Sequence, residues 1–337
     1  MHRWLAVAVV LLALLATGYW ASRGGAGGAE APFCRLEEHG GITVVFVSGT
    51  PRGKGRAIGA ALKARIRTEL DRALPEDPGL RDFVVRTAGE RLGRFVPPRC
   101  REEIEGIAEG AGILFGEALF LDTRYELAAH RLAREEGDLA GEAAVGPGPE
   151  AGRLFPDGVE EDLVVVVHED TEPPLALLAR PGMAGGFLGV KGNIAAAARP
   201  MPSETPPDLG GLVWTLLLRR LLEAQALEDP PDVTGPLSVA MALPDGSAVT
   251  LALAVSGTTR YAAGGGHSIT EDAPPSAGAT AAGRDPAERA SLAGRAARLL
   301  ADPPPPGRTL VGLRAGHGLW LVVVGPGGRR ESRLLGE

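Results

Sequence analysis

Paired strand patterns, with helical patterns grouped between them, constrain the fold of this chain more than any other feature. The apolar runs 237–243 and 248–255 are joined by a Pro-Asp-Gly turn, and the runs 310–313 and 319–324 lie similarly close together. Such spacing is typical of β-hairpins, whose strands are antiparallel. A doubly wound sheet would instead require strands that alternate with helices. The expected fold class is therefore α+β, with two strand groups stacked face to face and helices outside.

The rest of the chain supplies further elements by local pattern. β-Branched runs predict strands, and apolar residues at three- and four-residue spacing predict helices. Strands are expected at 42–47, 163–167 and 175–178, and helices at 57–74, from 101 to 112, and at 116–134, 210–227 and 285–301. The stretch 137–158 is rich in Gly, Pro, Ala and acids without any period, so we expect a loop or a poorly ordered insertion there.

The N-terminal apolar run predicts membrane targeting. Met1-His2-Arg3 precedes the run from Trp4 to Ala21, and about 18 apolar residues are just enough to span a bilayer. A removable signal peptide and a buried soluble helix are the alternatives, but the nearby cleavage candidate, Ala29-Glu30-Ala31, is followed by Pro32. We expect a membrane-anchored protein on the periplasmic or extracellular side. Its expected divisions are an anchor or signal segment at 1–22, a flexible linker at 23–41, a folded domain at 42–326 and a C-terminal tail at 327–337.

Charge and side-chain spacing argue against two classes of function. The formal net charge is −7 and the 35 Lys and Arg residues are spread along the chain, whereas binding to a nucleic-acid backbone requires clustered cations. The histidines show no HxxxH spacing and the cysteines no CxxC spacing, and such spacings are typical of metal sites. We therefore expect no nucleic-acid partner, no metal and no cofactor.

The chain contains two cysteines, Cys34 and Cys100. In an exported domain an even count most often indicates a disulfide. A bridge between them is expected, and it would tie the start of the domain to a distant helix. The alternative is two unpaired, partly buried thiols, because the sequence does not show whether their Cα atoms approach within bonding range.

Three motifs carry a resemblance to a known family. Residues 47–59 read VSGTPRGKGRAIG, residues 103–112 read EIEGIAEGAG, and residues 119–127 read LFLDTRYEL. They resemble the isopenicillin N acyltransferase family of N-terminal-nucleophile (Ntn) hydrolases, to which acid ceramidase and bile salt or penicillin V acylases are more distant relatives. The resemblance covers nearly all of 42–325 and implies a four-layer αββα sandwich of two stacked antiparallel sheets. Glycines in these motifs let helices end in left-handed geometry and let backbones approach closely.

The resemblance also implies amide cleavage by an N-terminal nucleophile, and this chain lacks that nucleophile in the expected segment. In that family the chain is cut after the helix that carries RYEL, and the Cys exposed by the cut attacks an amide carbonyl. From Arg124 to Asp170 this sequence contains no Cys, Ser or Thr. We therefore expect a degenerate enzyme that acts as a binding or scaffold protein, with a small acyl-amide-like ligand and an unknown protein partner. The alternative is an active acyltransferase or linear-amide hydrolase with a relocated nucleophile, for which Cys100, Ser48 and Thr50 are candidates.

Four residues match the family's pocket positions and are candidates for a vestigial site. Gly152 to Asp157 resembles the family's GRNxD turn, with Arg153 kept, the acid shifted by one and Leu in place of Asn. His267 stands where the family has a TNH turn, whose Asn is replaced by Gly266, and Arg289 matches a later arginine. Arg153 and Asp157 fit a surface ion pair in a mobile loop equally well.

Overall fold

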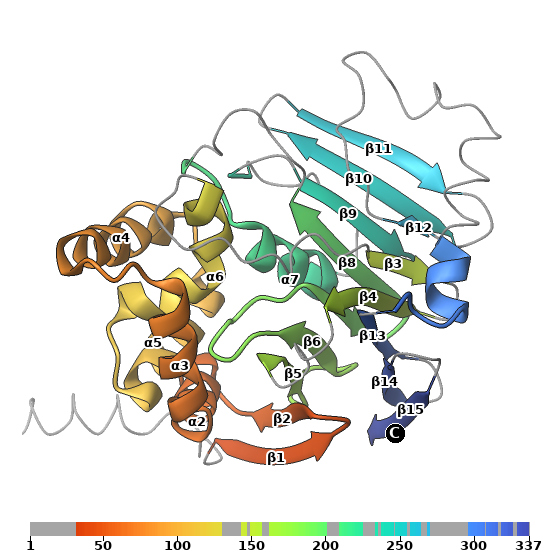
Figure 1. The fold of residues 1–337 in the computed structure, drawn as a ribbon, viewed down its shortest axis with the longest axis horizontal. Coiled ribbons are helices and arrows are strands. Elements are labelled where there is room, and N and C mark those ends of the chain that lie inside the picture. The colour runs from red at the N-terminus through yellow and green to blue at the C-terminus, as the bar shows by residue number, and fades with distance from the viewer. Residues whose placement is uncertain are drawn as a thin grey trace, which may run out of the picture.

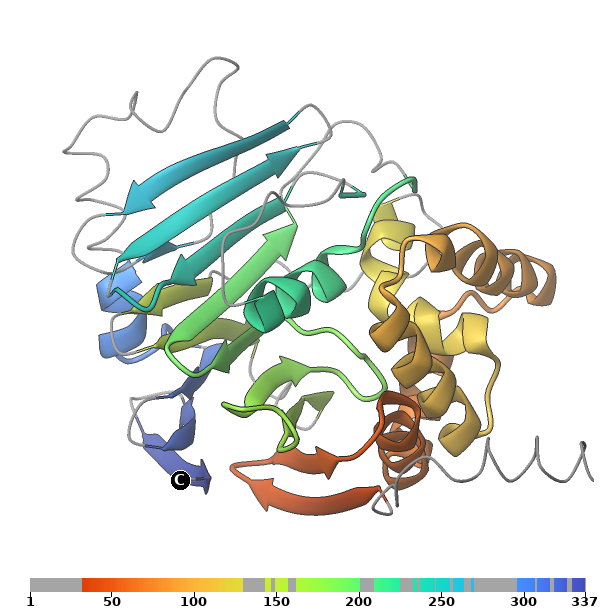
Figure 2. The ribbon, with the colours of Figure 1, turned by 180° about the vertical axis from the view of Figure 1, so that it is seen from behind.

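Two β-sheets lie face to face at the centre of the protein, as Figures 1 and 2 show from opposite sides. Strands β3, β4 and β13 of one sheet contact strands β7, β8 and β9 of the other. The computed structural model describes residues 32–129, 143–146, 149–156, 162–200, 209–224, 233–234, 237–245, 247–254, 257–263, 268–269, 296–306, 308–315, 318–325 and 329–336. The α+β fold class expected from the sequence is confirmed.

Within this described part, nine strands form the first sheet and six the second. The spatial order of the first is β1 (Phe33–His39), β2 (Ile42–Ser48), β5 (Val164–His168), β6 (Leu175–Ala179), β7 (Leu188–Lys191), β8 (Ile194–Pro200), β9 (Leu237–Ala242), β10 (Ala248–Ala254) and β11 (Gly257–Ala263). The order of the second is β12 (Ser268–Ile269), β3 (Ala143–Gly146), β4 (Glu150–Pro156), β13 (Arg308–Arg314), β14 (Leu319–Val324) and β15 (Arg330–Gly336). The hairpins β9–β10 and β13–β14 were both expected.

A group of helices follows β2 and lies beside the β1–β2–β5 end of the first sheet (Figure 1). It consists of α2 (Pro51–Ala61), α3 (Lys63–Ala73), α4 (Pro78–Glu90), the 3₁₀ turn η1 (Leu92–Arg94), α5 (Pro98–Ala111) and α6 (Phe115–Ala129). The Thr50 hydroxyl caps α2 by accepting from Gly53 N, and Pro51 occupies the first position of that helix. The helix expected at 57–74 is two helices, with a break at Leu62.

Glycines bring the backbones of α2 and α5 into direct contact. A Cβ on Gly55 would lie 1.9 Å from the carbonyl oxygen of Glu103, and a Cβ on Gly106 would lie 2.2 Å from that of Arg52. Gly59 and Gly110 repeat this contact one turn further along each helix. The G-x-x-x-G spacing in both motifs therefore has a packing cause, as the sequence predicted for these glycines.

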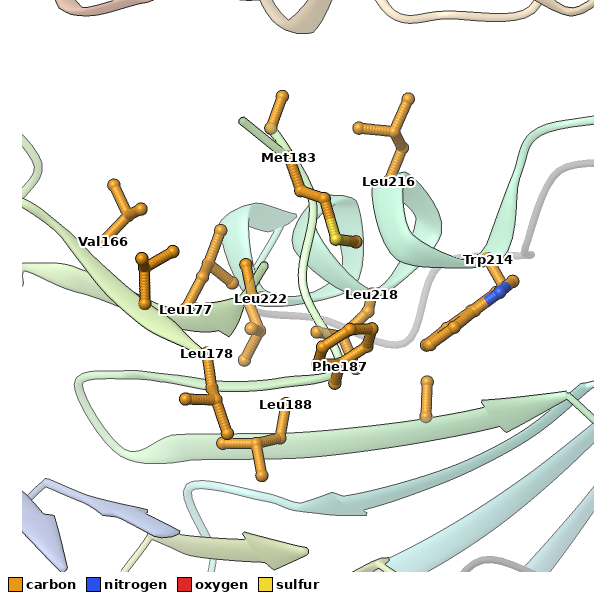
Figure 3. Packing of buried hydrophobic residues seen from close by; sticks show 14 of the residues in the cluster. Val166, Leu177, Leu178, Met183, Phe187, Leu188, Trp214, Leu216, Leu218 and Leu222 are labelled. Carbon is orange, nitrogen blue, oxygen red and sulfur yellow. The ribbon is translucent and has the colours of Figure 1, made fainter. Parts of the chain in front are cut away.

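Helix α7 (Trp214–Ala224) covers the outer face of the first sheet. Figure 3 shows Leu218 and Leu222 on the side of α7 that faces the strands, above Leu178 and Leu188. On the other sheet, a helix at 296–301 packs its apolar side chains over β3 and β4. The layers therefore run helix, sheet, sheet, helix.

Three expectations about the chain need correction. The stretch 137–158 is not simply a loop, because it holds β3 and β4, whose Ala, Gly and Pro residues give neither a β-branched run nor a clear alternation. The linker 23–41 contains β1 and the tail 327–337 contains β15. Both are edge strands with many charged residues, which the pattern of apolar residues does not reveal.

The expected pair of antiparallel sheets also needs a correction. β2 and β5 pair in parallel, while the other neighbouring strands are antiparallel. A parallel pair requires a long crossover, and here it contains α2 to α6 together with β3 and β4. The predicted anchor at 1–22 lies outside the described residues, and none of the helices that are described is long and apolar enough to cross a membrane.

Candidate functional site

Strand β4 places Arg153 in the layer between the two sheets. The side chain is fully buried, and its Nη1 donates to the carbonyl oxygen of Ala198 on β8 at 3.1 Å. Its guanidinium carbon lies 5.6 Å from the ring centroid of Phe155 and 5.5 Å from that of Phe187. The interpretation as a surface residue in a mobile loop is therefore wrong for Arg153.

The strand next to Arg153 offers no reactive side chain. Ala143 on β3 is its partner across the β3–β4 ladder, and β3 consists of two alanines, a valine and a glycine, all buried. A buried guanidinium can bind a carbonyl or carboxylate oxygen through its fixed fork of N–H donors. Arg153 here binds the carbonyl oxygen of Ala198, and β3 carries no nucleophile beside it.

The other three expected pocket residues, Asp157, His267 and Arg289, lie outside the described residues. The described part of the chain places only Arg153 of the four. Whether all four share one pocket stays a prediction.

The expected disulfide is wrong in this structure, where Cys34 and Cys100 are both free thiols. Cys34 lies on the edge strand β1, opposite Val47. Cys100 is buried in the first turn of α5, where desolvation raises its pKa to about 12 against the opposing effect of the Arg219 charge. The two thiols therefore lie on different elements, Cys34 partly exposed and Cys100 buried.

The candidates for a relocated nucleophile have other roles or surroundings. Cys100 is 2% exposed, and its raised pKa leaves it protonated at neutral pH. The Thr50 hydroxyl is engaged in capping α2. Ser48 ends β2 beside that cap and is half-buried. None of these three lies on β3 or β4, the strands that carry Ala143 and Arg153.

Two buried carboxylates on α6 were not singled out from the sequence. Asp122 accepts from the backbone nitrogens of Ala184 and Gly185 at 2.9 Å, and burial raises its pKa to about 6. Glu126, one turn further along, accepts from Trp214 N at 3.1 Å, and burial raises its pKa to about 8. Asp122 thus joins α6 to the turn before β7, and Glu126 joins α6 to the start of α7. The sequence did offer a signal for them, because Asp122 and Glu126 are acidic residues within an otherwise largely apolar helical motif.

Two charged residues of the glycine motifs, Lys54 and Glu103, are also buried and paired. Glu103 on α5 accepts from Nη2 of Arg219 on α7 at 2.8 Å. Lys54 on α2 is 2% exposed and its Nζ donates to both oxygens of Asp170 at 2.9 and 3.0 Å. Such pairs require both partners, because a lone buried charge is costly. The motifs therefore build the contact between the helices and the first sheet.

His168, at the end of β5, is also buried and lies close to Glu103. Its Nε2 lies 3.9 Å from Glu103 Oε1. Desolvation, followed by the positive charges of Arg219 and Lys54, holds the His168 pKa well below its usual range, so the ring is neutral. Across the described residues, no three His, Cys, Asp or Glu side chains are placed to hold a metal ion.

Comparison with known proteins adds no relative. Neither a protein-family model nor a curated protein matches this chain.

Proposed function

We propose that this chain is a divergent, catalytically inactive relative of the isopenicillin N acyltransferase-like Ntn hydrolases, tethered to a membrane on its exported side and acting as a binding or scaffold protein. The observation that carries the proposal is the pairing of buried Arg153 with Ala143. A cation suited to an acyl oxygen is kept, while its neighbour on β3 is an alanine without nucleophilic oxygen or sulfur.

The layer order and the motif contacts support the family assignment. Two sheets lie between helices, as the resemblance implies. The glycines and charges of the three motifs are used for packing, through the α2–α5 contact and the Glu103–Arg219 pair. Residues with packing roles remain necessary when chemistry is lost, so an inactive relative is expected to retain them.

An active enzyme with a relocated nucleophile is the second candidate. Its candidates are Cys100, whose thiol is buried and protonated, Thr50, whose hydroxyl caps a helix, and Ser48, which ends β2 beside that cap. A barrier to amide cleavage is lowered by an activated nucleophile and a placed oxyanion donor together. No described neighbour acts as a base for the candidate thiol or hydroxyls. The binding role is therefore the better account.

The proposal is tested on the purified full-length chain. Mass spectrometry should find one polypeptide without an internal cut between Leu127 and Leu163, and no acid should be released from N-acyl amides or penicillin-type substrates. A homogeneous internal cut would contradict it. Turnover that is lost in Cys100→Ala but kept in Cys34→Ala would favour the relocated nucleophile instead.

The tether is tested separately. Reporter fusions placed after Gly28 should be active on the exported side, because the apolar run 4–21 directs the chain to the membrane. Fusions that report the cytoplasm would refute the location and leave the proposal about catalysis standing.

A further inference from the structure

Strand β1 presents an open edge at one end of the first sheet. It pairs with β2 along its inner side over seven residues without a bulge, and no described strand pairs with its outer side. Figure 1 shows it at the lower rim of the molecule. Phe33 and Leu36 on this strand are each 45% exposed. A long, regular edge strand with exposed apolar side chains is a template for another strand.

The charges on β1 are arranged symmetrically about Leu36. Arg35 precedes it and Glu37 follows it, and the two side chains form an ion pair within the strand. In an antiparallel pair with a two-fold axis at Leu36, Arg35 of each copy lies opposite Glu37 of the other. The four charges would then alternate in sign on the face of the sheet opposite the two leucines, and each would have neighbours of opposite sign.

Other registers are less favourable for the same strand. A two-fold axis at Arg35 would place two arginines opposite each other, and an axis at Glu37 would place two glutamates opposite each other. Like charges that are directly opposite destabilise a strand pair. The charges of β1 therefore favour the axis at Leu36 over these two registers.

We propose that β1 pairs antiparallel with β1 of a second copy of this chain, centred on Leu36, so that the first sheet continues across a dimer. This interface is independent of the proposed loss of catalysis. It covers Phe33 and Leu36 with a strand of matching charge, and it uses backbone groups that the monomer leaves at an open edge.

Cysteine cross-linking of the full chain tests the register. Leu36→Cys places two thiols on the axis, where Cα atoms of opposite residues lie about 4.5–5.5 Å apart, within the range of a disulfide. Mild oxidation should give a covalent dimer of twice the chain mass. Leu114→Cys is the matched control, because Leu114 is 66% exposed but lies off the sheet.

Native Cys34 provides a second test of the same register. The proposed pairing places Cys34 opposite Glu38 of the other copy, so wild type should not cross-link while Glu38→Cys should. Residues 34 and 38 of one strand are about 13 Å apart, which excludes a bond within the chain. Adding Cys34→Ser to Glu38→Cys should abolish the dimer.

Charge variants test the energetics without new thiols. Glu37→Arg or Arg35→Glu alone places like charges opposite each other and should weaken self-association about tenfold, and the double exchange should restore it. Dimer yield from Leu36→Cys no higher than from Leu114→Cys would overturn the proposal. So would a double exchange no better than the single variants, cross-links to a different protein, or a dimer formed through Ser332→Cys on β15.

Discussion

Replacing Gly106 by alanine perturbs the contact between α2 and α5 at one atom. The added Cβ would lie 2.2 Å from the carbonyl oxygen of Arg52 and 2.8 Å from Arg56 N. Both neighbours are helix backbone and cannot rotate away as a side chain would. Restoring ordinary contact requires the helices to separate by roughly an ångström, which is the kind of overpacking that costs about 1–3 kcal/mol or more.

The net effect on stability follows from two opposing contributions. Alanine in place of glycine gains up to about 1 kcal/mol from helix propensity. Separation of the helices loosens the packing of the fully buried Ile104 and Ile107 on α5. Since Gly110 makes a similar contact with Arg56, the helices cannot slide to relieve the clash. We expect Gly106→Ala to lower the free energy of unfolding by about 2–3 kcal/mol.

Thermal unfolding followed by circular dichroism measures this change. A loss of about 2–3 kcal/mol corresponds to a Tm lower by about 3–5 °C in a chain of this size. The matched control is Gly79→Ala on α4, where the nearest atom to the added Cβ is a side-chain oxygen of Asp77 at 3.4 Å. That variant should stay within about 1 kcal/mol of wild type. Equal stability of the two variants would refute the close backbone contact.

Three further predictions concern buried charges and thiols. The pKa of Glu126 is about 8 in the folded protein and about 4.3 in the unfolded chain. Wild type should therefore lose stability relative to Glu126→Gln as pH rises from about 5 to 8. Chemical denaturation measures this, and a free energy of unfolding that changes equally with pH in both proteins would contradict it. Asp170→Ala should destabilise the protein by about 3 kcal/mol, because it leaves Lys54 unpaired. Adding Lys54→Met should recover most of this loss. A double-mutant cycle without coupling between the two residues would show that their ion pair does not contribute to stability. Ellman's reagent should label Cys34 in the native protein and Cys100 only after unfolding, because burial raises the Cys100 pKa to about 12. Thiols that react only after a reductant is added would indicate a disulfide instead.

The sequence predicted the elements with clear runs of large apolar or β-branched residues. The hairpins β9–β10 and β13–β14 and the helix α7 were expected close to their observed bounds. β3 and β4 were missed because their Ala, Gly and Pro residues give neither a β-branched run nor a clear alternation. β1 was missed for the opposite reason, since an edge strand with Arg35, Glu37 and Glu38 resembles a polar linker.

The candidate site was predictable only in part. Motif resemblance pointed to Arg153, but no pattern in the sequence showed that it lies between the sheets beside Phe187. The disulfide was expected from the number of cysteines, whereas the structure depends on where β1 and α5 place them. Burial of Asp122 and Glu126 follows from α6 being enclosed on several sides, which is a property of the tertiary structure.

The parallel pairing of β2 with β5 has a consequence for how the chain folds during synthesis. Residues 49–163 separate the two strands, and this segment includes β3 and β4 of the other sheet. The second sheet also requires β13 to β15, which lie near the C-terminal end of the chain. The first sheet is complete only after β11, which ends at Ala263, and the second only after β15, which ends at Gly336. Long-range pairing of this kind is slow. The sandwich is therefore expected to fold as one cooperative unit, only after the ribosome has released nearly the whole chain.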